Sequence, residues 1–291
     1  MKPKGVILYL SRSTAGDLTN LKRSLKLLDR HFNRRFGYPV LVFHEDFTEE
    51  LMARIRSWTR APVEFPQVSF QLPAHIDAAQ VPPRFLGCFG IGYRHMCRFF
   101  AGPIYRHPAL QQYDWYWRLD TDSFVLQRID YDVFAAMEDG GFDYGYLALQ
   151  KEFPEVVAGL WDAALDYARS HGLPRERLAP LCDAAGSWNL DYYYNNFEIC
   201  RLSFGRSAAY QDFFEHLDRT GGIYYRRWGD APIRTLAVML LVPPERRRHF
   251  ADLGYAHAGY YSNRPVELRE RFRLRAQALL SPKKIATTEI K

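Results

Sequence analysis

The first 70 residues alternate between short apolar strands and amphipathic helices, and this alternation limits the fold more than any other feature of the sequence. Apolar side chains recur at helical spacing from Leu18 to Phe32, and Thr48 followed by two glutamates is typical of a capped helix start. Such alternation is typical of a parallel sheet with helices on its faces. The predicted elements are strands at Val6–Leu10, Pro39–Phe43 and within 63–70, and helices over 18–32 and 51–58.

The remainder of the chain continues as an α/β pattern without an internal repeat, a low-complexity segment or a clear linker. We therefore expect one compact domain over residues 1–291, built on a Rossmann-type mixed, mainly parallel sheet flanked by helices. The further predicted elements are helices at Tyr93–Phe100, Tyr131–Met137, Pro154–Ser170 and Leu268–Leu280, and strands at Trp115–Leu119 and Tyr144–Leu149.

Composition narrows the class of protein. A hydrophobic content of 47% with 15% aromatic residues is enough to build a large core, so the composition predicts a folded chain rather than a disordered one. The net charge is +6, and most of the 39 basic residues are arginines scattered along the chain, with a single run at 246–248. Scattered arginine favours binding of phosphates and carboxylates over binding of nucleic acid, which needs a concentrated basic face.

Cysteine spacing and hydropathy add two expectations. The four cysteines, Cys88, Cys97, Cys182 and Cys200, form no Cys-x-x-Cys pair, so a zinc site is not predicted, although their number allows two disulfides. The longest apolar run, Thr235–Val242, is far below the roughly 20 residues that cross a bilayer. The sequence therefore predicts a chain without a transmembrane segment or signal peptide.

A pair of aspartates follows the aromatic strand predicted at Trp115–Leu119. Asp120 and Asp122 would lie at the carboxyl end of that strand, where open parallel sheets bind ligands, and the Ser11-Arg12 loop follows another strand end. Carboxylates suit Mg²⁺ or Mn²⁺, and such an ion can neutralise a departing nucleoside diphosphate. A solvated turn is the alternative for this short motif. The pattern favours a nucleotide-sugar-binding half at 1–125 and an acceptor-binding half at 126–291.

Three later residues could also take part in chemistry. Glu198 lies among aromatic and amide residues, Asp230 follows a glycine before a proline-started helix, and His257 lies in a polar segment and could bind a metal. Each has a structural alternative: Glu198 could pair with an arginine, Asp230 could cap its helix, and His257 could be a surface residue.

Several motifs occur together in a fixed order: Arg12, Arg30–Asn33, Pro39 to Glu50, Tyr93–Arg98, Tyr113–Arg118, Asn196–Ile199, Gly221–Pro232 and Gly254–His257. In this order they resemble the fungal Golgi α-1,2-mannosyltransferases, glycosyltransferase family 15, from about Val6 to Tyr261. The resemblance implies a GT-A fold, GDP-mannose as donor, Mn²⁺ (or Mg²⁺) as cofactor, and transfer of mannose to a mannoside or glycan hydroxyl with retention of configuration, with an α-1,2 linkage expected.

The resemblance also implies roles for individual residues. Asp120 and His257 would bind the metal, with Asp122 as a further ligand. Glu198 would lie near the anomeric carbon and Asp230 on the acceptor side, and both, with Tyr93, are predicted to be catalytic. The predicted donor-binding residues are Arg12, Tyr93, Arg98, Arg118 and Asn196.

This chain departs from the family pattern at three places. The family usually has Glu-Pro at the metal turn, where this chain has Asp120-Thr121, and Arg226 and Arg234 replace an acidic residue and a histidine, which bears on acceptor specificity. Retention allows two routes. Glu198 could attack the anomeric carbon, or it could stabilise an oxocarbenium-like charge while the acceptor enters on the leaving-group face.

Two rival functions are considered. One is a GT-A transferase with another donor, GDP-fucose or a UDP-sugar, and the other is a non-catalytic glycan-binding or nucleic-acid-binding module, since aromatic residues and arginine suit both ligands. The transferase reading predicts no nucleic-acid partner. The absence of an anchor predicts a cytoplasmic enzyme, with peripheral membrane association where lipid-linked acceptors are built; the Golgi lumen is the alternative if the chain is part of a longer protein.

Overall fold

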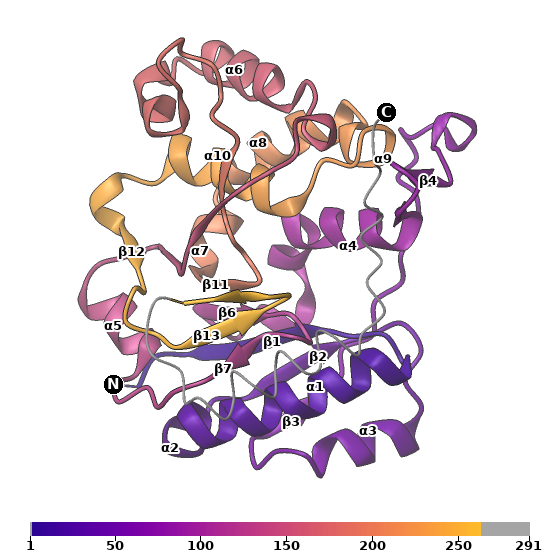
Figure 1. Cartoon of the computed structure of the whole chain (residues 1–291), viewed down its shortest axis with the longest axis vertical. Coiled ribbons are helices and arrows are strands. Elements are labelled where there is room, and N and C mark those ends of the chain that lie inside the picture. Colours follow the sequence, from indigo (N-terminus) through magenta and orange to yellow (C-terminus); the bar gives the residue numbers. More distant parts are fainter. Residues whose placement is uncertain (1, 263–291) are drawn as a thin grey trace.

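A seven-stranded sheet runs through the centre of the computed structural model, which describes residues 2–262 (Figure 1). Of these seven strands only β11 is antiparallel to its neighbours, β6 and β8, whereas the other neighbouring pairs are parallel. The predicted mixed, mainly parallel sheet is therefore confirmed. In spatial order the strands are β12 (Arg247–His249), β8 (Tyr144–Tyr146), β11 (Phe197–Arg201), β6 (Trp115–Leu119), β1 (Gly5–Leu10), β2 (Val40–Phe43) and β3 (Val63–Glu64).

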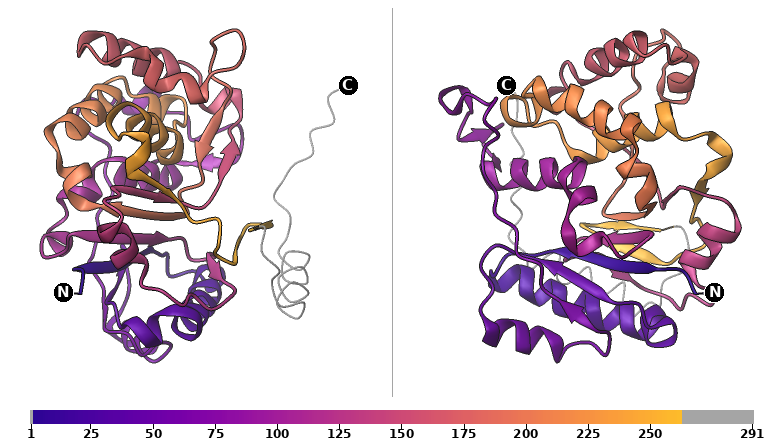
Figure 2. Two further views of the ribbon diagram at one scale, coloured as in Figure 1. Left: turned by 90° about the vertical axis from the view of Figure 1, so that its left-hand side faces the viewer. Right: turned by 180° about the vertical axis from the view of Figure 1, so that it is seen from behind.

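Helices cover both faces of this sheet, and the two views in Figure 2 show the same layers. One face carries α1 (Ala15–Leu28), α2 (Arg34–Phe36), α3 (Glu49–Arg56) and α5 (Val133–Asp139). The other carries α4 (Ile91–Ala101), α6 (Leu160–Ser170), α7 (Leu202–Arg206), α8 (Ala208–Arg219), α9 (Gly222–Tyr225) and α10 (Asp230–Leu241).

Alternation along the strands assigns each side chain to one of two cores. On β6, Trp115 and Trp117 pack into the core beneath α1, whereas Tyr116 packs into the core beneath α4 and α10. Leu119 joins the α1 side, so Arg118 belongs to the α4 and α10 side. On β11, Glu198 lies opposite Arg118 in the antiparallel register. The same face of the sheet therefore presents both charged side chains to α4 and α10.

Three small sheets lie outside the central one. Strand β13 (Tyr255–His257) pairs with β14 (Tyr260–Tyr261) and with β7 (Phe124–Val125), β9 (Leu149–Lys151) pairs with β10 (Asp191–Tyr193), and β4 (Arg84–Phe85) pairs with β5 (Phe89–Gly90). The first of these sheets matters most for the site, because it attaches a C-terminal strand to the turn that follows β6.

The predicted elements agree with the structure in most places. Thr48 caps α3 by accepting a hydrogen bond from the Leu51 amide at 3.2 Å. The helix predicted at Pro154–Ser170 is divided, because Gly159 adopts a left-handed conformation between a 3₁₀ turn and α6. The strand predicted at Tyr144–Leu149 ends at Tyr146. The helix predicted at Leu268–Leu280 lies outside the described residues.

Within residues 2–262, no helix combines the length and the apolar character needed to cross a membrane. All four cysteines are free, so the two disulfides that their number allowed do not form.

Candidate active site

The turn after β6 and strand β13 bring the predicted metal ligands together. Antiparallel pairing of Ala256 with Phe124 places His257 beside the Asp120 to Asp122 turn. His257 Nε2 lies 3.0 Å from Asp122 Oδ1 and 3.8 Å from Asp120 Oδ2. The three predicted ligands, two from one turn and one from a strand more distant in the sequence, therefore lie in one place in the folded chain.

The charges of this cluster are coupled. Burial opposes the charged form of His257, but its hydrogen bond to Asp122 and the charges of both aspartates outweigh burial and raise the pKa of His257 above its usual value. Burial likewise opposes ionisation of Asp122, but the hydrogen bond and charge of His257 lower the pKa of Asp122. Without a metal, the histidine therefore acts as the counter-ion of the aspartates.

Two neighbours fix the orientation of the His257 ring. The Tyr194 hydroxyl lies 2.6 Å from His257 Nδ1, and the Asn196 amide nitrogen lies 3.1 Å from the same atom. Tyr255 in turn donates to Asn196 Oδ1 at 2.7 Å. Asn196, predicted to bind the donor, therefore supports the metal-side histidine. Tyr194 was missed, because a run of three tyrosines reads as strand core.

The carboxylate oxygens and the imidazole nitrogen of this cluster are suitable ligands for a hard divalent ion, whose coordination a bound nucleotide would complete. No group of three or more His, Cys, Asp and Glu side chains in residues 2–262 is arranged to hold a metal by itself. Ions of this kind are commonly held by one or two carboxylates together with substrate phosphates. The 3.0 Å separation of the His257 and Asp122 atoms also matches two adjacent ligands with bonds of about 2.1 Å.

Arg118 connects this cluster to the acceptor half. Its guanidinium donates to Asp120 Oδ1 at 3.1 Å and also to Asp230, and it lies over the Phe100 ring at 3.6 Å from the centroid. Burial opposes its charge, but Asp120 and Asp230 raise the pKa of Arg118. Arg118 therefore stays a cation beside the predicted metal turn.

Asp230 does not cap its helix. Helix α10 begins at Asp230 itself, with Gly229 at the N-cap position and no side-chain cap. The Asp230 carboxylate instead accepts hydrogen bonds from Arg118 and, at 2.8 Å, from Asn195. The alternative of a capping role is therefore wrong, and the predicted acceptor-side carboxylate lies directly next to the predicted donor-side arginine.

Glu198 lies deeper, with a side chain that is only 1% exposed. One carboxylate oxygen accepts from Tyr116, and the other accepts from Tyr144 at 3.0 Å and from Arg234 at 3.1 Å. Burial raises the pKa of Glu198 to about 7, and the charge of Arg118 limits the rise. The structural alternative of a pairing with an arginine is thus what the structure shows, and a role in catalysis stays a prediction.

Tyr93 accepts a hydrogen bond from a second buried ion pair, Arg227 with Glu152, that sequence reasoning missed. Arg227 donates to the Tyr93 hydroxyl at 2.7 Å and to Glu152 at 3.0 Å, and it stacks over Phe89. Burial raises the pKa of Tyr93, and the charge of Asp230 contributes. Arg227 also has a left-handed backbone, with φ of 64°. No signal in the sequence indicates that Arg227 is buried whereas Arg226, the residue before it, is exposed.

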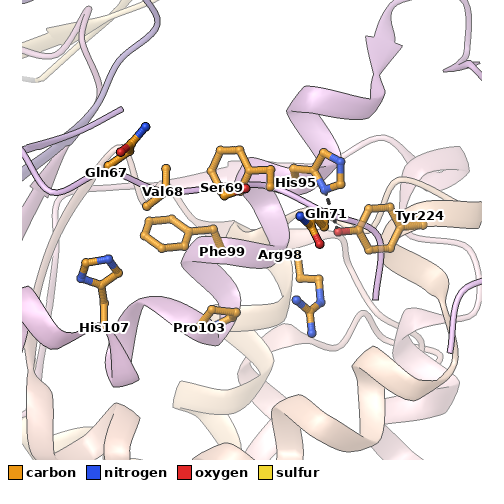
Figure 3. Close-up of a pocket in the computed structure, with 11 residues that line it drawn as sticks. Gln67, Val68, Ser69, Gln71, His95, Arg98, Phe99, Pro103, His107 and Tyr224 are labelled. Carbon is orange, nitrogen blue, oxygen red and sulfur yellow. Dashed lines mark hydrogen bonds between the residues drawn. The ribbon is translucent and has the colours of Figure 1, made fainter. Parts of the chain in front are cut away.

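Two predicted donor-binding arginines lie away from this cluster. Arg12 follows β1 and forms an exposed pair with Asp17, its side chain 76% exposed. Arg98 forms two 2.8 Å hydrogen bonds with Asp218. It lines a cavity of about 260 Å³. Figure 3 shows Arg98 with Phe99, His107 and Tyr224 in the lining of this cavity.

The donor contact of Arg98 stays a prediction, and helix geometry separates its side chain from that of Tyr93. Five residues of α-helix separate Arg98 from Tyr93, which places the two side chains about 140° apart around α4.

The two arginines that depart from the family pattern have different environments. Arg226 is exposed and contacts the main chain near α6, with one hydrogen bond to the Ala158 carbonyl at 3.4 Å. Arg234 is completely buried. Only Arg226 is therefore accessible to a ligand, and the effect predicted for Arg234 on acceptor specificity cannot come from direct contact with the acceptor at a surface.

Comparison with known proteins supports the resemblance found in the sequence. The chain is 37% identical over 262 residues to the α-1,2 mannosyltransferase KTR1 of Saccharomyces cerevisiae, covering 84% of this chain and 67% of that protein. It is 32% identical to the glycolipid 2-alpha-mannosyltransferase of the same yeast, covering 91% of this chain and 63% of that protein. The chain thus spans about two thirds of the length of these relatives.

A solved structure gives the same result for the fold. Core-mannan synthase A from Aspergillus fumigatus, determined in a Mn/GDP form, superposes with a TM-score of 0.83 at 29% identity, covering 89% of this chain and 76% of that one. The GT-A-like fold is thereby confirmed. The family model described as glycolipid 2-alpha-mannosyltransferase matches residues 1–270. The chain belongs to the glycolipid 2-alpha-mannosyltransferase family, as the resemblance in its motifs predicted.

Proposed function

We propose that this protein transfers mannose from GDP-mannose to a hydroxyl of a mannoside or glycan, forming an α-1,2 linkage with retention of configuration. Relatives named as α-1,2-mannosyltransferases and a similar structure in a Mn/GDP form support the proposal. The observation that carries it is the convergence of Asp120, Asp122 and His257 beside Arg118 at the carboxyl end of β6.

The donor diphosphate would lie at this strand end. Asp120 and His257, with Asp122 as a further ligand, would hold Mn²⁺, or Mg²⁺, which supplies charge neutralisation for the departing GDP. Arg118, a cation held beside Asp120, would contact the donor. Asn196 and Tyr194 keep the His257 ring in place. Arg12, exposed after β1, is free to turn from Asp17 toward a nucleotide, because exposed pairs are weak.

The burial of Glu198 bears on the two routes to retention. A nucleophile must touch the anomeric carbon, yet the Glu198 carboxylate is held by Tyr116, Tyr144 and Arg234 and has almost no exposed surface. We therefore favour the route in which Glu198 acts through its charge and the acceptor enters on the leaving-group face. Asp230, next to Arg118, would orient the acceptor hydroxyl.

The proposal names two partners, a nucleotide-sugar donor and a mannoside acceptor. Peripheral association with a membrane that carries lipid-linked acceptors is a further part of the proposal, and the cytoplasmic location predicted from the sequence stays a prediction. Arg226 is the accessible departure from the family pattern, so any difference in acceptor preference should depend on it.

Ligand-dependent thermal unfolding tests the proposal. GDP with Mn²⁺ should stabilise the protein, by about 2.7 kcal/mol when GDP is present at a hundred times its Kd, and EDTA should abolish the effect. A panel of GDP-mannose, GDP-fucose and UDP-sugars, read by hydrolysis and by transfer to methyl α-mannoside, should select GDP-mannose. Turnover of another donor would support the rival transferase. Salt-sensitive RNA binding without GDP binding would overturn the transferase reading.

A further inference from the structure

Arg234 is a fully buried charged side chain near the candidate site. It lies one turn after Asp230 on α10, has no exposed surface, and packs against the rings of Tyr105 and Tyr210 at 4.6 and 5.0 Å from their centroids. Its guanidinium donates to the Glu198 carboxylate, to the hydroxyls of both tyrosines, and to the Phe100 carbonyl. A buried arginine with this many partners is held in one orientation.

Glu198 is the one anionic hydrogen-bond partner of Arg234 in the described chain. Burial raises the pKa of Tyr210 well above its usual value, so this hydroxyl stays neutral, and Phe100 contributes a main-chain carbonyl. The network also closes on itself, because the Tyr105 hydroxyl lies 3.1 Å from that of Tyr116, which donates to Glu198. Arg234 therefore places a positive charge next to the Glu198 carboxylate from the α10 side.

The same guanidinium also supports Arg118. Arg234 donates to the Phe100 carbonyl at 2.6 Å, and Tyr210, which accepts from Arg234, donates to the Ala101 carbonyl at 2.6 Å. These bonds fix the last turn of α4. The Phe100 ring of that turn lies beneath the Arg118 guanidinium, 3.6 Å from it.

We propose that Arg234 is a positioning residue that holds the Glu198 side chain in one orientation, favours its ionised form and, through Phe100, holds the platform on which Arg118 rests. This inference depends on the proposed function for its effect on transfer, but the pairing itself can be tested on the unliganded protein.

The charged and titratable groups around Glu198 determine how loss of Arg234 would change the protonation of Glu198. Without the arginine, the protonated form of Glu198 would be favoured, because the remaining nearby cation, Arg118, is already shared by two aspartates. The groups that face Glu198 are Tyr116 and Arg118 from β6, Tyr144 from β8, Cys200 from β11, and Asp230 and Arg234 from α10, with Tyr105 and Tyr210 behind the arginine.

The experiment compares Arg234→Met with Arg234→Lys, which keeps the charge but loses the planar fork. Arg206→Met is the control, because it removes a half-buried arginine that donates to the carbonyls of Tyr105, Leu110 and Tyr113 and makes no hydrogen bond to Glu198 among the described residues. Two readouts are needed: the pH profile of kcat for transfer from GDP-mannose, and the thermal midpoint of the unliganded protein from pH 5 to pH 8.

Arg234→Met should shift the acid limb of the pH profile of kcat to higher pH by about one unit. Arg234→Lys should lower kcat without shifting this limb. The loss of thermal midpoint in Arg234→Met should grow with pH, because burial of an unpaired Glu198 costs most where it must ionise. In a Glu198→Gln background this pH dependence should vanish. Even if Arg234→Met does not fold at pH 8, it should fold at pH 5 and in that background.

Two results would overturn the inference: a midpoint loss in Arg234→Met that is the same at every pH, or one that persists unchanged in the Glu198→Gln background. Failure of the proposed function has a different signature. Normal turnover by Glu198→Gln would remove Glu198 from the reaction while leaving the pH-dependent pairing with Arg234 intact.

Discussion

Arg118 on β6 and Asp230 on α10 form a buried ion pair across the candidate site, with side chains that are 3% and 6% exposed. The same guanidinium binds Asp120 on the metal-side turn. One arginine thus neutralises two carboxylates that come from the two halves of the chain, and it fixes the distance between the predicted donor and acceptor sides.

Asp230→Asn should lower the free energy of unfolding by about 3 kcal/mol, because Arg118 would lose a buried anionic partner. Urea denaturation of the unliganded protein measures this change. The matched control is Asp130→Asn, since Asp130 pairs with Arg128 at a site where both side chains are 71% exposed. That control should cost less than about 1 kcal/mol, and equal losses in the two variants would contradict a special role for the buried pair.

His257→Ala should weaken Mn²⁺-dependent GDP binding by at least about tenfold, since even residues that only orient a metal ligand commonly have effects of this size. Titration calorimetry with GDP, with and without Mn²⁺, measures the change. His249→Ala is the control, because His249 is exposed and bonds only the Leu147 carbonyl, at 2.9 Å, among the described residues. An unchanged manganese dependence in His257→Ala would reject its role as a ligand.

Glu198→Gln should reduce kcat by a factor on the order of 10² to 10³ with little loss of GDP affinity, because the change removes a charge near the reacting centre and keeps the shape of the side chain. Steady-state transfer assays and GDP titration separate the two effects. Mass spectrometry of the native protein incubated with donor alone should detect no mannosyl adduct on Glu198. A stable adduct there would support the double-displacement route.

Stability of the unliganded protein should depend on pH through the pair of His257 and Asp122. The pKa of His257 is raised, so its contribution is complete below about pH 6.5 and is lost as pH rises through the folded value. The pKa of Asp122 is lowered, so its contribution is present above its usual pKa and is lost at more acidic pH. The difference in thermal midpoint between the native protein and Asp122→Asn should therefore be largest near pH 5 to 6, and a difference that rises steadily to pH 9 would contradict the pairing.

Local patterns in the sequence were enough for much of the fold. The strand Trp115–Leu119 was predicted with the bounds that the structure shows, and Thr48 was correctly identified as a helix cap. These features depend on neighbours in sequence, namely alternation of side chains along a strand and hydrogen bonds within one helical turn. The division of the helix at Gly159 was not predicted, because a glycine within an amphipathic pattern does not by itself indicate a left-handed backbone conformation.

Residue types and their order in the sequence also determined the family, and they gave the residues that are predicted to bind a metal, since carboxylates after a strand and a distant histidine are suited to that chemistry. Which arginine meets which carboxylate was decided only by the tertiary structure. Arg98 pairs with Asp218, Arg118 pairs with Asp120 and Asp230, and the buried Arg234 pairs with Glu198. All are arginines on regular elements, and helical or strand spacing gives the face of a side chain but not the partner that packing brings to it from another part of the fold. That choice follows from burial, because a charge removed from water must meet an opposite charge wherever the fold places one.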